Sequence, residues 1–153
     1  MQVQFVDPVI ASGLDIESLQ NEGIVSKAWC PRIPIPRPQS FFRFEVACAM
    51  SHVRAAQMIV DSNVPWAFVF EDDNVIDEKC IPKFHKICEW AQLHHNVFNV
   101  INISPCNSLH FPTIRPALYP NTQGCTNALL YSRNGAKHLL SKIYPLSSPI
   151  DDW

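Results

Sequence analysis

The sequence predicts an α/β fold, in which one mixed or mostly parallel sheet is covered by helices on both faces. Two observations favour it: apolar residues recur at helical spacing in some stretches, and short continuous apolar runs lie between those stretches. The predicted order is helix, strand, helix, strand, strand, helix, and strands that alternate with helices favour such a sheet. With 153 residues, 47% of them hydrophobic, the chain is expected to form a single domain over residues 1–153.

The first half of the chain contains the longest predicted helix, over residues 42–60. Its apolar residues recur at intervals of three and four and give one wide face. These residues are Val46, Ala49, Met50, Val53, Ala56 and Val60. The Asn63-Val64-Pro65 stretch ends the helix. The apolar run Trp66 to Phe70 follows, and it is typical of a strand covered on both faces.

Before this helix the signals are shorter. Val3 to Val6 is an apolar stretch that we expect to form a strand, and Asp15 is expected to cap a small helix that ends before Gly23. The prolines between Cys30 and Gln39 exclude a helix or a central strand there, so this stretch is expected to be an extended loop or a surface arm.

The second half predicts two helices and two strands. Ile81 to Leu93 is expected to be a helix, with Pro82 tolerated in its first turn. Val97 to Ile103 and Cys125 to Tyr131 are expected to be strands, and Asn134 to Ile143 is expected to be the last helix.

Composition excludes several classes of function. The chain has 12 basic and 14 acidic residues and no long run of like charge, so we expect a small-molecule partner rather than nucleic acid. It lacks a signal-peptide pattern and an apolar run that could span a bilayer, so a cytoplasmic location is expected. Its six cysteines form no Cys-x-x-Cys pair, which disfavours a zinc ribbon and favours reduced, structural thiols.

Three consecutive carboxylates, Glu71-Asp72-Asp73, follow the apolar run and are called the acidic triplet here. They repel one another, and they stand where open α/β sheets bind ligands, at the carboxyl end of a strand. A divalent cation, Mn²⁺ or Mg²⁺, would offset the repulsion and leave coordination positions for substrate phosphates. Because side chains alternate along a strand, Glu71 and Asp73 are expected on one side and Asp72 on the other. The alternative is a solvated turn whose acids cap the next helix.

Two further groups of residues are candidates for chemistry. Glu45 and His52 are seven residues apart on the long predicted helix, so they lie almost above one another at the edge of its apolar face. They either face a cleft together or, as is common for a single histidine, serve the structure. The stretch Pro149-Ile150-Asp151-Asp152 supplies a second acidic pair, which by itself is an ordinary polar terminus. A glycine-rich phosphate loop and a Gly-x-Ser-x-Gly motif are absent, which disfavours P-loop chemistry and serine hydrolysis.

Two ordered blocks of sequence resemble glycosyltransferase family 25, which includes bacterial lipooligosaccharide galactosyltransferases and collagen hydroxylysine galactosyltransferases. The first block runs from Phe44-Glu45-Val46-Ala47-Cys48-Ala49-Met50-Ser51-His52 through Asn63-Val64-Pro65 to the acidic triplet. The second comprises Gly124 to Ala136 followed by Pro149-Ile150-Asp151. Together the blocks cover about residues 40–153.

The resemblance implies a GT-A-like (Rossmann-like) fold, a UDP-sugar donor (most often UDP-galactose), a divalent metal and a hydroxyl acceptor on a glycan or protein, as in lipopolysaccharide biosynthesis. The acidic triplet matches the family's metal and diphosphate site. Glu45 and His52 match its Glu and Ser-His positions and become candidate catalytic residues. Asp151 matches the acid of the second block and becomes the candidate base that removes the hydroxyl proton.

One part of the family pattern is missing. Family members normally begin with a strand of the type Val-Ile-Asn-Leu followed by basic residues, and Met1 to Asp7 does not match it. We therefore expect a sheet truncated at its N-terminal strand. Its open edge should lead either to self-association into a homo-oligomer or to a weak affinity for the donor. The alternative function is a catalytically inactive family-25-like remnant that acts as a binding or interaction module. An aspartyl-phosphate phosphatase is disfavoured, because it needs Asp where this chain has Glu71.

Overall fold

The secondary structure comes from a computed structural model, which describes residues 3–29, 38–74, 77–103 and 127–150. The helices are α1 (Ile16–Asn21), α2 (Gln39–Asp61), α3 (Ile81–His94) and α4 (Arg133–Lys142), with the short 3-10 helices η1 (Ala11–Gly13) and η2 (Glu78–Cys80). The strands are β1 (Trp66–Phe70), β2 (Val100–Asn102) and β3 (Ala128–Ser132). Among the helices of these ranges, not one is both long enough and apolar enough to cross a membrane.

The three strands form one sheet in the order β1-β3-β2, and both ladders are antiparallel. Since β1 and β2 both run antiparallel to β3, they run parallel to each other, with α3 as their crossover. The expected parallel relation therefore exists between β1 and β2, but β3 lies between them. The expectation of a mixed or mostly parallel sheet is wrong for the described strands, because the last strand inserts in the opposite direction.

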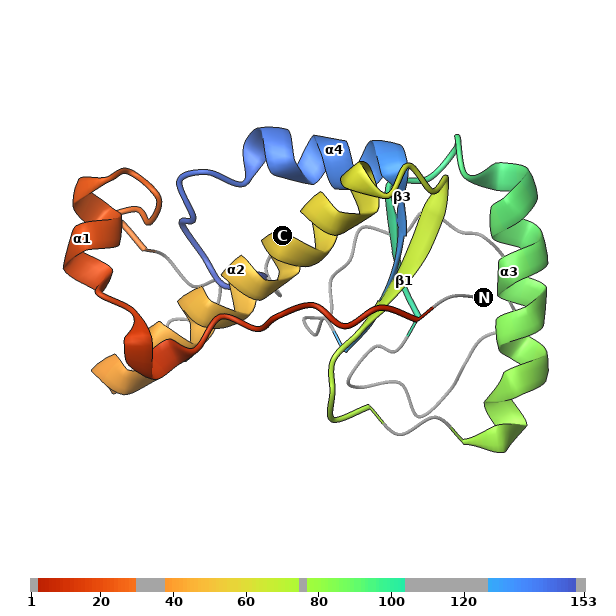
Figure 1. The fold of residues 1–153 in the computed structure, drawn as a ribbon, viewed down its shortest axis with the longest axis horizontal. Helices are drawn as coiled ribbons and strands as arrows, with labels where there is room; N and C mark the ends of the chain where they lie inside the picture. The colour runs from red at the N-terminus through yellow and green to blue at the C-terminus, as the bar shows by residue number, and fades with distance from the viewer. Residues whose placement is uncertain (1–2, 30–37, 75–76, 104–126, 151–153) are drawn as a thin grey trace.

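Helices cover both faces of this sheet, as predicted for the α/β class. Figure 1 shows α2 and α4 together on one side and α3 on the other. Alternate residues of β3 point to the two layers. Leu129 and Tyr131 are buried with Ile59 of α2, whereas Leu130 is buried with Ala91 of α3.

Helix α2 has the apolar face that its spacing predicts, and it extends a few residues beyond the predicted ends. Val46, Ala49 and Val53 are buried in one cluster with Ile143 and Leu146, which follow α4. The chain then turns at Asn63, which has a positive φ of 59°, before β1 begins. This packing fixes α2 along the sheet and so fixes the residues at the edge of its apolar face.

The N-terminal segment agrees with prediction in one part and differs in another. Asp15 caps α1 by accepting a hydrogen bond from the Ser18 N–H, and Gly23 follows the helix with a φ of 74°. The strand expected from Val3 to Val6 is wrong, because the backbone there is irregular and the Phe5 side chain is 91% exposed. A short apolar stretch becomes a strand only where another strand pairs with it.

In the second half, the predicted elements exist with shifted ends. The strand expected at Val97 to Ile103 is limited to β2, the last described strand ends at Ser132, and α4 begins at Arg133. Residues 30–37 of the predicted loop and residues 125–126 of the expected last strand lie outside the described residues, and Gln39, predicted as the end of that loop, begins α2.

The junction of β3 and α4 is closely packed. The Ser132 hydroxyl donates to the Phe98 carbonyl oxygen at 2.6 Å and accepts from the Gly135 N–H at 2.9 Å. A Cβ atom on Gly135 would lie 1.9 Å from the backbone oxygen of Asn99. Glycine is therefore required where α4 passes the chain before β2.

Candidate functional site

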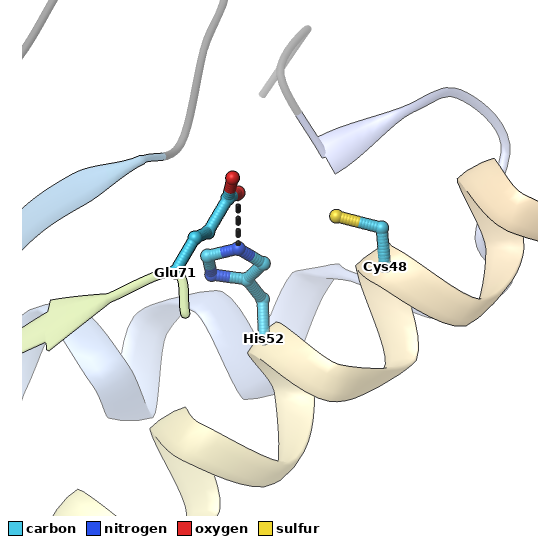
Figure 2. A group of neighbouring side chains, drawn as sticks. All are labelled: Cys48, His52 and Glu71. Atoms are coloured by element: carbon cyan, nitrogen blue, oxygen red, sulfur yellow. Dashed lines mark hydrogen bonds and ion pairs between the residues drawn. The ribbon is translucent and has the colours of Figure 1, made fainter. Parts of the chain in front are cut away.

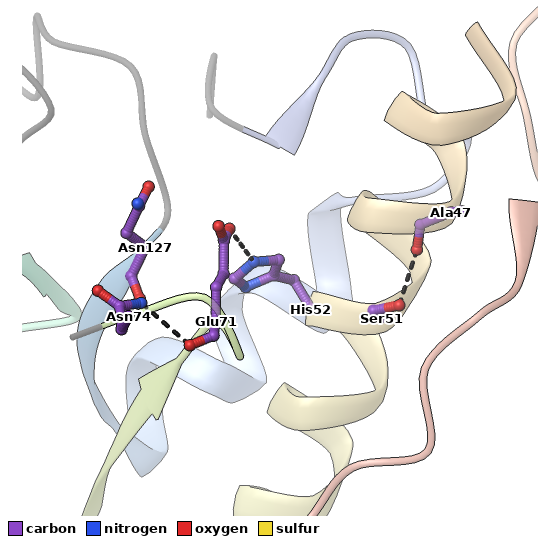
Figure 3. Close-up of polar contacts among 6 residues, drawn as sticks. All are labelled: Ala47, Ser51, His52, Glu71, Asn74 and Asn127. Atoms are coloured by element: carbon purple, nitrogen blue, oxygen red, sulfur yellow. Dashed lines mark hydrogen bonds and ion pairs between the residues drawn. The ribbon is translucent and has the colours of Figure 1, made fainter. Parts of the chain in front are cut away.

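The turn that carries the acidic triplet is hydrogen-bonded to the start of β3. Beyond the last ladder pair, the Glu71 N–H donates to the Asn127 carbonyl oxygen at 2.9 Å. The Glu71 carbonyl oxygen accepts from the Asn74 N–H at 3.2 Å and from Asn74 Nδ2 at 3.1 Å. Asn74 Nδ2 also contacts the Asn127 carbonyl oxygen. Residues 71–74, called the acidic turn below, are thus fixed in position by main-chain and amide contacts (Figure 3).

The side chain of Glu71 turns toward helix α2. Its Oε1 lies 3.4 Å from Nε2 of His52, whose side chain is only 5% exposed (Figure 2). The other ring nitrogen of His52, Nδ1, is buried and has no hydrogen-bond partner among the described residues. The predicted candidate His52 is therefore in contact with the acidic triplet, although the two come from different elements.

Cys48 completes a small group with these two residues. One potential ligand atom each of Cys48, His52 and Glu71 lies within 4.8 Å of the others. Thiolate, imidazole and carboxylate are ligands that Zn²⁺ accepts. Within the described ranges, this group and not the acidic triplet is the set of three potential ligands that lies together.

Asp72 and Asp73 lie on the acidic turn itself, and both are exposed. In the described part of the chain their carboxylates make no hydrogen bond or ion pair. Carboxylate oxygens without a protein partner are suitable ligands for Mn²⁺ or Mg²⁺. The structure therefore places two members of the triplet where a cation can reach them, and metal binding by the triplet stays a prediction.

Glu45 lies on the same side of α2 as Cys48 and His52, as the seven-residue spacing predicts. It is about 10 Å from His52 along the helix axis at 1.5 Å per residue. Its Oε2 accepts a hydrogen bond from Nε1 of Trp29 at 3.3 Å, and the Trp29 ring packs edge-on against Phe42 at 4.9 Å. Glu45 is thus held by the segment before α2 and belongs to the same side of the molecule as His52.

Asp151 lies outside the described residues, so its predicted role is untested by geometry. The residue before it, Ile150, is buried in the cluster that contains Val46 and Val53 of α2.

Sequence reasoning missed several residues of this site, namely Trp29, Cys48, Asn74 and Asn127. Cys48 had a usable signal, because it lies four residues before His52 and so shares its side of the helix. Asn74 and Asn127 had none, because their contact depends on the pairing of β1 with β3 far along the chain.

The comparison with known families agrees with these observations. Residues 40–153 match the family described as glycosyltransferase family 25 (LPS biosynthesis protein). The chain therefore belongs to glycosyltransferase family 25, which confirms the resemblance seen in the sequence and indicates glycosyl transfer from a sugar donor to an acceptor. The match includes Glu45, His52, the acidic triplet and Asp151. No match was found among curated proteins or among solved structures.

Proposed function

We propose that this chain transfers a sugar, with galactose as the first candidate, from a UDP-sugar to a hydroxyl group of a glycan or protein acceptor. Family membership supports the transfer reaction and a role in lipopolysaccharide biosynthesis. The observation that carries the donor site is the exposed pair Asp72 and Asp73 on a fixed turn at the carboxyl end of β1. The β1-α3-β2 crossover, whose two strands both end at the sheet edge that carries this turn, supports a GT-A-like fold for the whole domain.

A divalent cation fits the residues of the acidic turn. Asp72 and Asp73 offer oxygen ligands, which Mn²⁺ and Mg²⁺ prefer, and their exposure leaves coordination positions for phosphate oxygens. Glu71 is the third carboxylate of the proposed site. When bound, the cation would stabilise the charge of the departing diphosphate.

Transfer also requires a base near the acceptor, separate from the carboxylates that hold a cation. We assign this role to Asp151, which matches the acid of the family's second block. The burial of Ile150 against α2 supports this assignment, because α2 carries Glu45 and His52. These two residues are proposed to line the sugar side of the site, with Asp151 taking the proton of the acceptor hydroxyl.

Thermal unfolding with a panel of UDP-sugars, with and without Mn²⁺, tests the donor and the metal together. A ligand that binds only the folded state stabilises it by about 2.7 kcal/mol at a hundred times its Kd. A donor sugar should therefore raise the Tm when Mn²⁺ is present. Asp73→Asn should reduce this increase and leave the Tm of the ligand-free chain unchanged. An equal increase in the variant, or none with any UDP-sugar, would contradict the proposed site.

The role of Asp151 is tested by measuring sugar transfer in Asp151→Asn. Turnover should fall at least about a hundredfold, because the variant cannot accept the hydroxyl proton. Binding of Mn²⁺ and UDP should remain as in the unaltered chain. Unchanged turnover, or lost UDP binding, would remove Asp151 from the mechanism. If the unaltered chain binds UDP and Mn²⁺ but transfers no sugar to any acceptor, the inactive binding module becomes the better description.

A further inference from the structure

The three carboxylates of the acidic triplet have different surroundings. Among the described residues, Asn127 accepts from the Glu71 N–H, Asn74 donates to its carbonyl oxygen, and His52 contacts its carboxylate. Asp72 and Asp73 are exposed and have no such side-chain contacts among the described residues. The surroundings of Glu71 are those of an anchor for the turn, and the surroundings of the two aspartates are those of cation ligands.

The tautomer of His52 follows from its burial. A proton on Nδ1 would be a buried N–H without an acceptor in the described part of the chain, which is rare in folded proteins. In the neutral ring, the proton therefore belongs on Nε2, from where it is donated to Glu71 Oε1 at 3.4 Å, at the long end of hydrogen-bonding distance.

The same argument disfavours a metal ion between Cys48, His52 and Glu71. A cation on Nε2 needs the lone pair of that nitrogen and moves the proton to Nδ1. Histidines that bind metals normally donate this second N–H to an acceptor, and Nδ1 of His52 has none among the described residues. The contact between His52 and Glu71 is thus better explained as a hydrogen bond that orients the carboxylate.

We propose that His52 is a positioning residue. It holds the Glu71 carboxylate against α2, and Glu71 in turn fixes the acidic turn so that Asp72 and Asp73 alone contact the cation. This inference rests on the proposed function for the identity of the cation. It revises the proposed site in two respects: Glu71 becomes an anchor instead of a ligand, and His52 positions Glu71 instead of lining the sugar side.

The affinity for Mn²⁺ distinguishes an anchor from a ligand. Glu71→Gln keeps an oxygen that accepts from His52 and removes the charge, and Asp73→Asn makes the same change at a proposed ligand. By calorimetry, Glu71→Gln should weaken Mn²⁺ binding by about threefold or less, because a carboxylate away from the cation acts only through screened charge. Asp73→Asn should weaken it by about tenfold or more. Equal losses in the two variants would make Glu71 a ligand and overturn the inference.

Two substitutions of His52 separate hydrogen bonding from packing. His52→Leu keeps an apolar side chain in the buried position but has no donor, whereas His52→Gln places an amide N–H near the position of Nε2. Mn²⁺-dependent UDP binding should weaken about tenfold in His52→Leu, as expected for a lost hydrogen bond to a charged group. His52→Gln should restore it to within about threefold. Equal weakening in both variants would mean that His52 only fills space.

The hydrogen bond itself can be tested without any metal. In ¹⁵N-histidine NMR of the full chain, His52 should carry its proton on Nε2, and this signal should shift in Glu71→Gln. A proton on Nδ1 would overturn the inference, as would stoichiometric Zn²⁺ binding that is lost in Cys48→Ser. If the unaltered chain does not bind Mn²⁺, that result contradicts the proposed function. The tautomer of His52 is measured without metal, so it tests the hydrogen bond to Glu71 independently of Mn²⁺ binding.

Discussion

The two ends of the β1–β3 ladder are built from different kinds of residue. At one end, where Trp66 pairs with Ser132, a buried hydroxyl and a glycine let α4 pass close to the chain before β2. At the other end, where Phe70 pairs with Ala128, the chain continues into the acidic turn, whose aspartates are exposed. The first end is specified by close packing. The second contains carboxylates that no packing requirement explains, which is why we place the function there.

The largest expected effect on stability is at the closely packed end. Gly135→Ala should lower the free energy of unfolding by about 3 kcal/mol, because the new Cβ would meet the Asn99 backbone, which cannot move without disturbing β2. Urea denaturation measures the change. Gly13→Ala is the matched control, since no atom from outside its own stretch of backbone lies within 4 Å of the Cβ it would add. Similar losses in both variants would show that this end is not tightly packed.

The ladder pair next to the closely packed end, Ala67 with Tyr131, should respond to high pH. Burial raises the pKa of Tyr131 to about 12, whereas in the unfolded chain it is about 10. The folded state therefore holds this proton more tightly, and the resulting stabilisation is present below pH 10 and lost as the pH rises from about 10 to about 12. It amounts to at most about 2.7 kcal/mol. Denaturation at pH 9 and above pH 11 should show this loss in the unaltered chain and a smaller loss in Tyr131→Phe. Equal losses of stability in the unaltered chain and in Tyr131→Phe would mean that ionisation of Tyr131 is not the cause.

The smallest effect on stability is expected at the acidic end. Without a cation, Asp73→Asn should change the free energy of unfolding by less than about 0.5 kcal/mol, as is usual for exposed positions without partners. The same urea denaturation that is used for Gly135→Ala measures it. If Asp73→Asn lost as much stability as Gly135→Ala, the acidic turn would have a structural role and the contrast between the two ends would fail.

The elements that were predicted correctly from the sequence are those that neighbouring residues specify. The apolar spacing of α2, the continuous run of β1 and the cap at Asp15 each depend on residues that are close in the chain. The strand expected from Val3 to Val6 failed because two exposed apolar residues do not make a strand without a partner. The position of β3 between β1 and β2 was not predictable either, since strand pairing depends on contacts between distant segments.

The candidate site also has features that the local sequence could predict and features that depend on contacts between distant segments. Residue type and place in the chain were enough to select Glu45, His52 and the acidic triplet. They did not reveal that His52 contacts Glu71, because one lies on α2 and the other follows β1. The different surroundings of Glu71 and the two aspartates also depend on Asn127, which reaches the acidic turn only through the pairing of β3.

The central position of β3 also affects the order in which the molecule can assemble. In the described sheet, β1 and β2 each form their ladder with β3, so neither has a strand partner until residues 128–132 have been synthesised. Closing such distant segments carries a cost in chain entropy that local contacts do not. On the ribosome, α2 and α3 can form early, whereas the acidic turn acquires its support from Asn127 only when β3 has been synthesised. A nascent chain therefore completes its candidate site only after Asn127 and β3 have been synthesised.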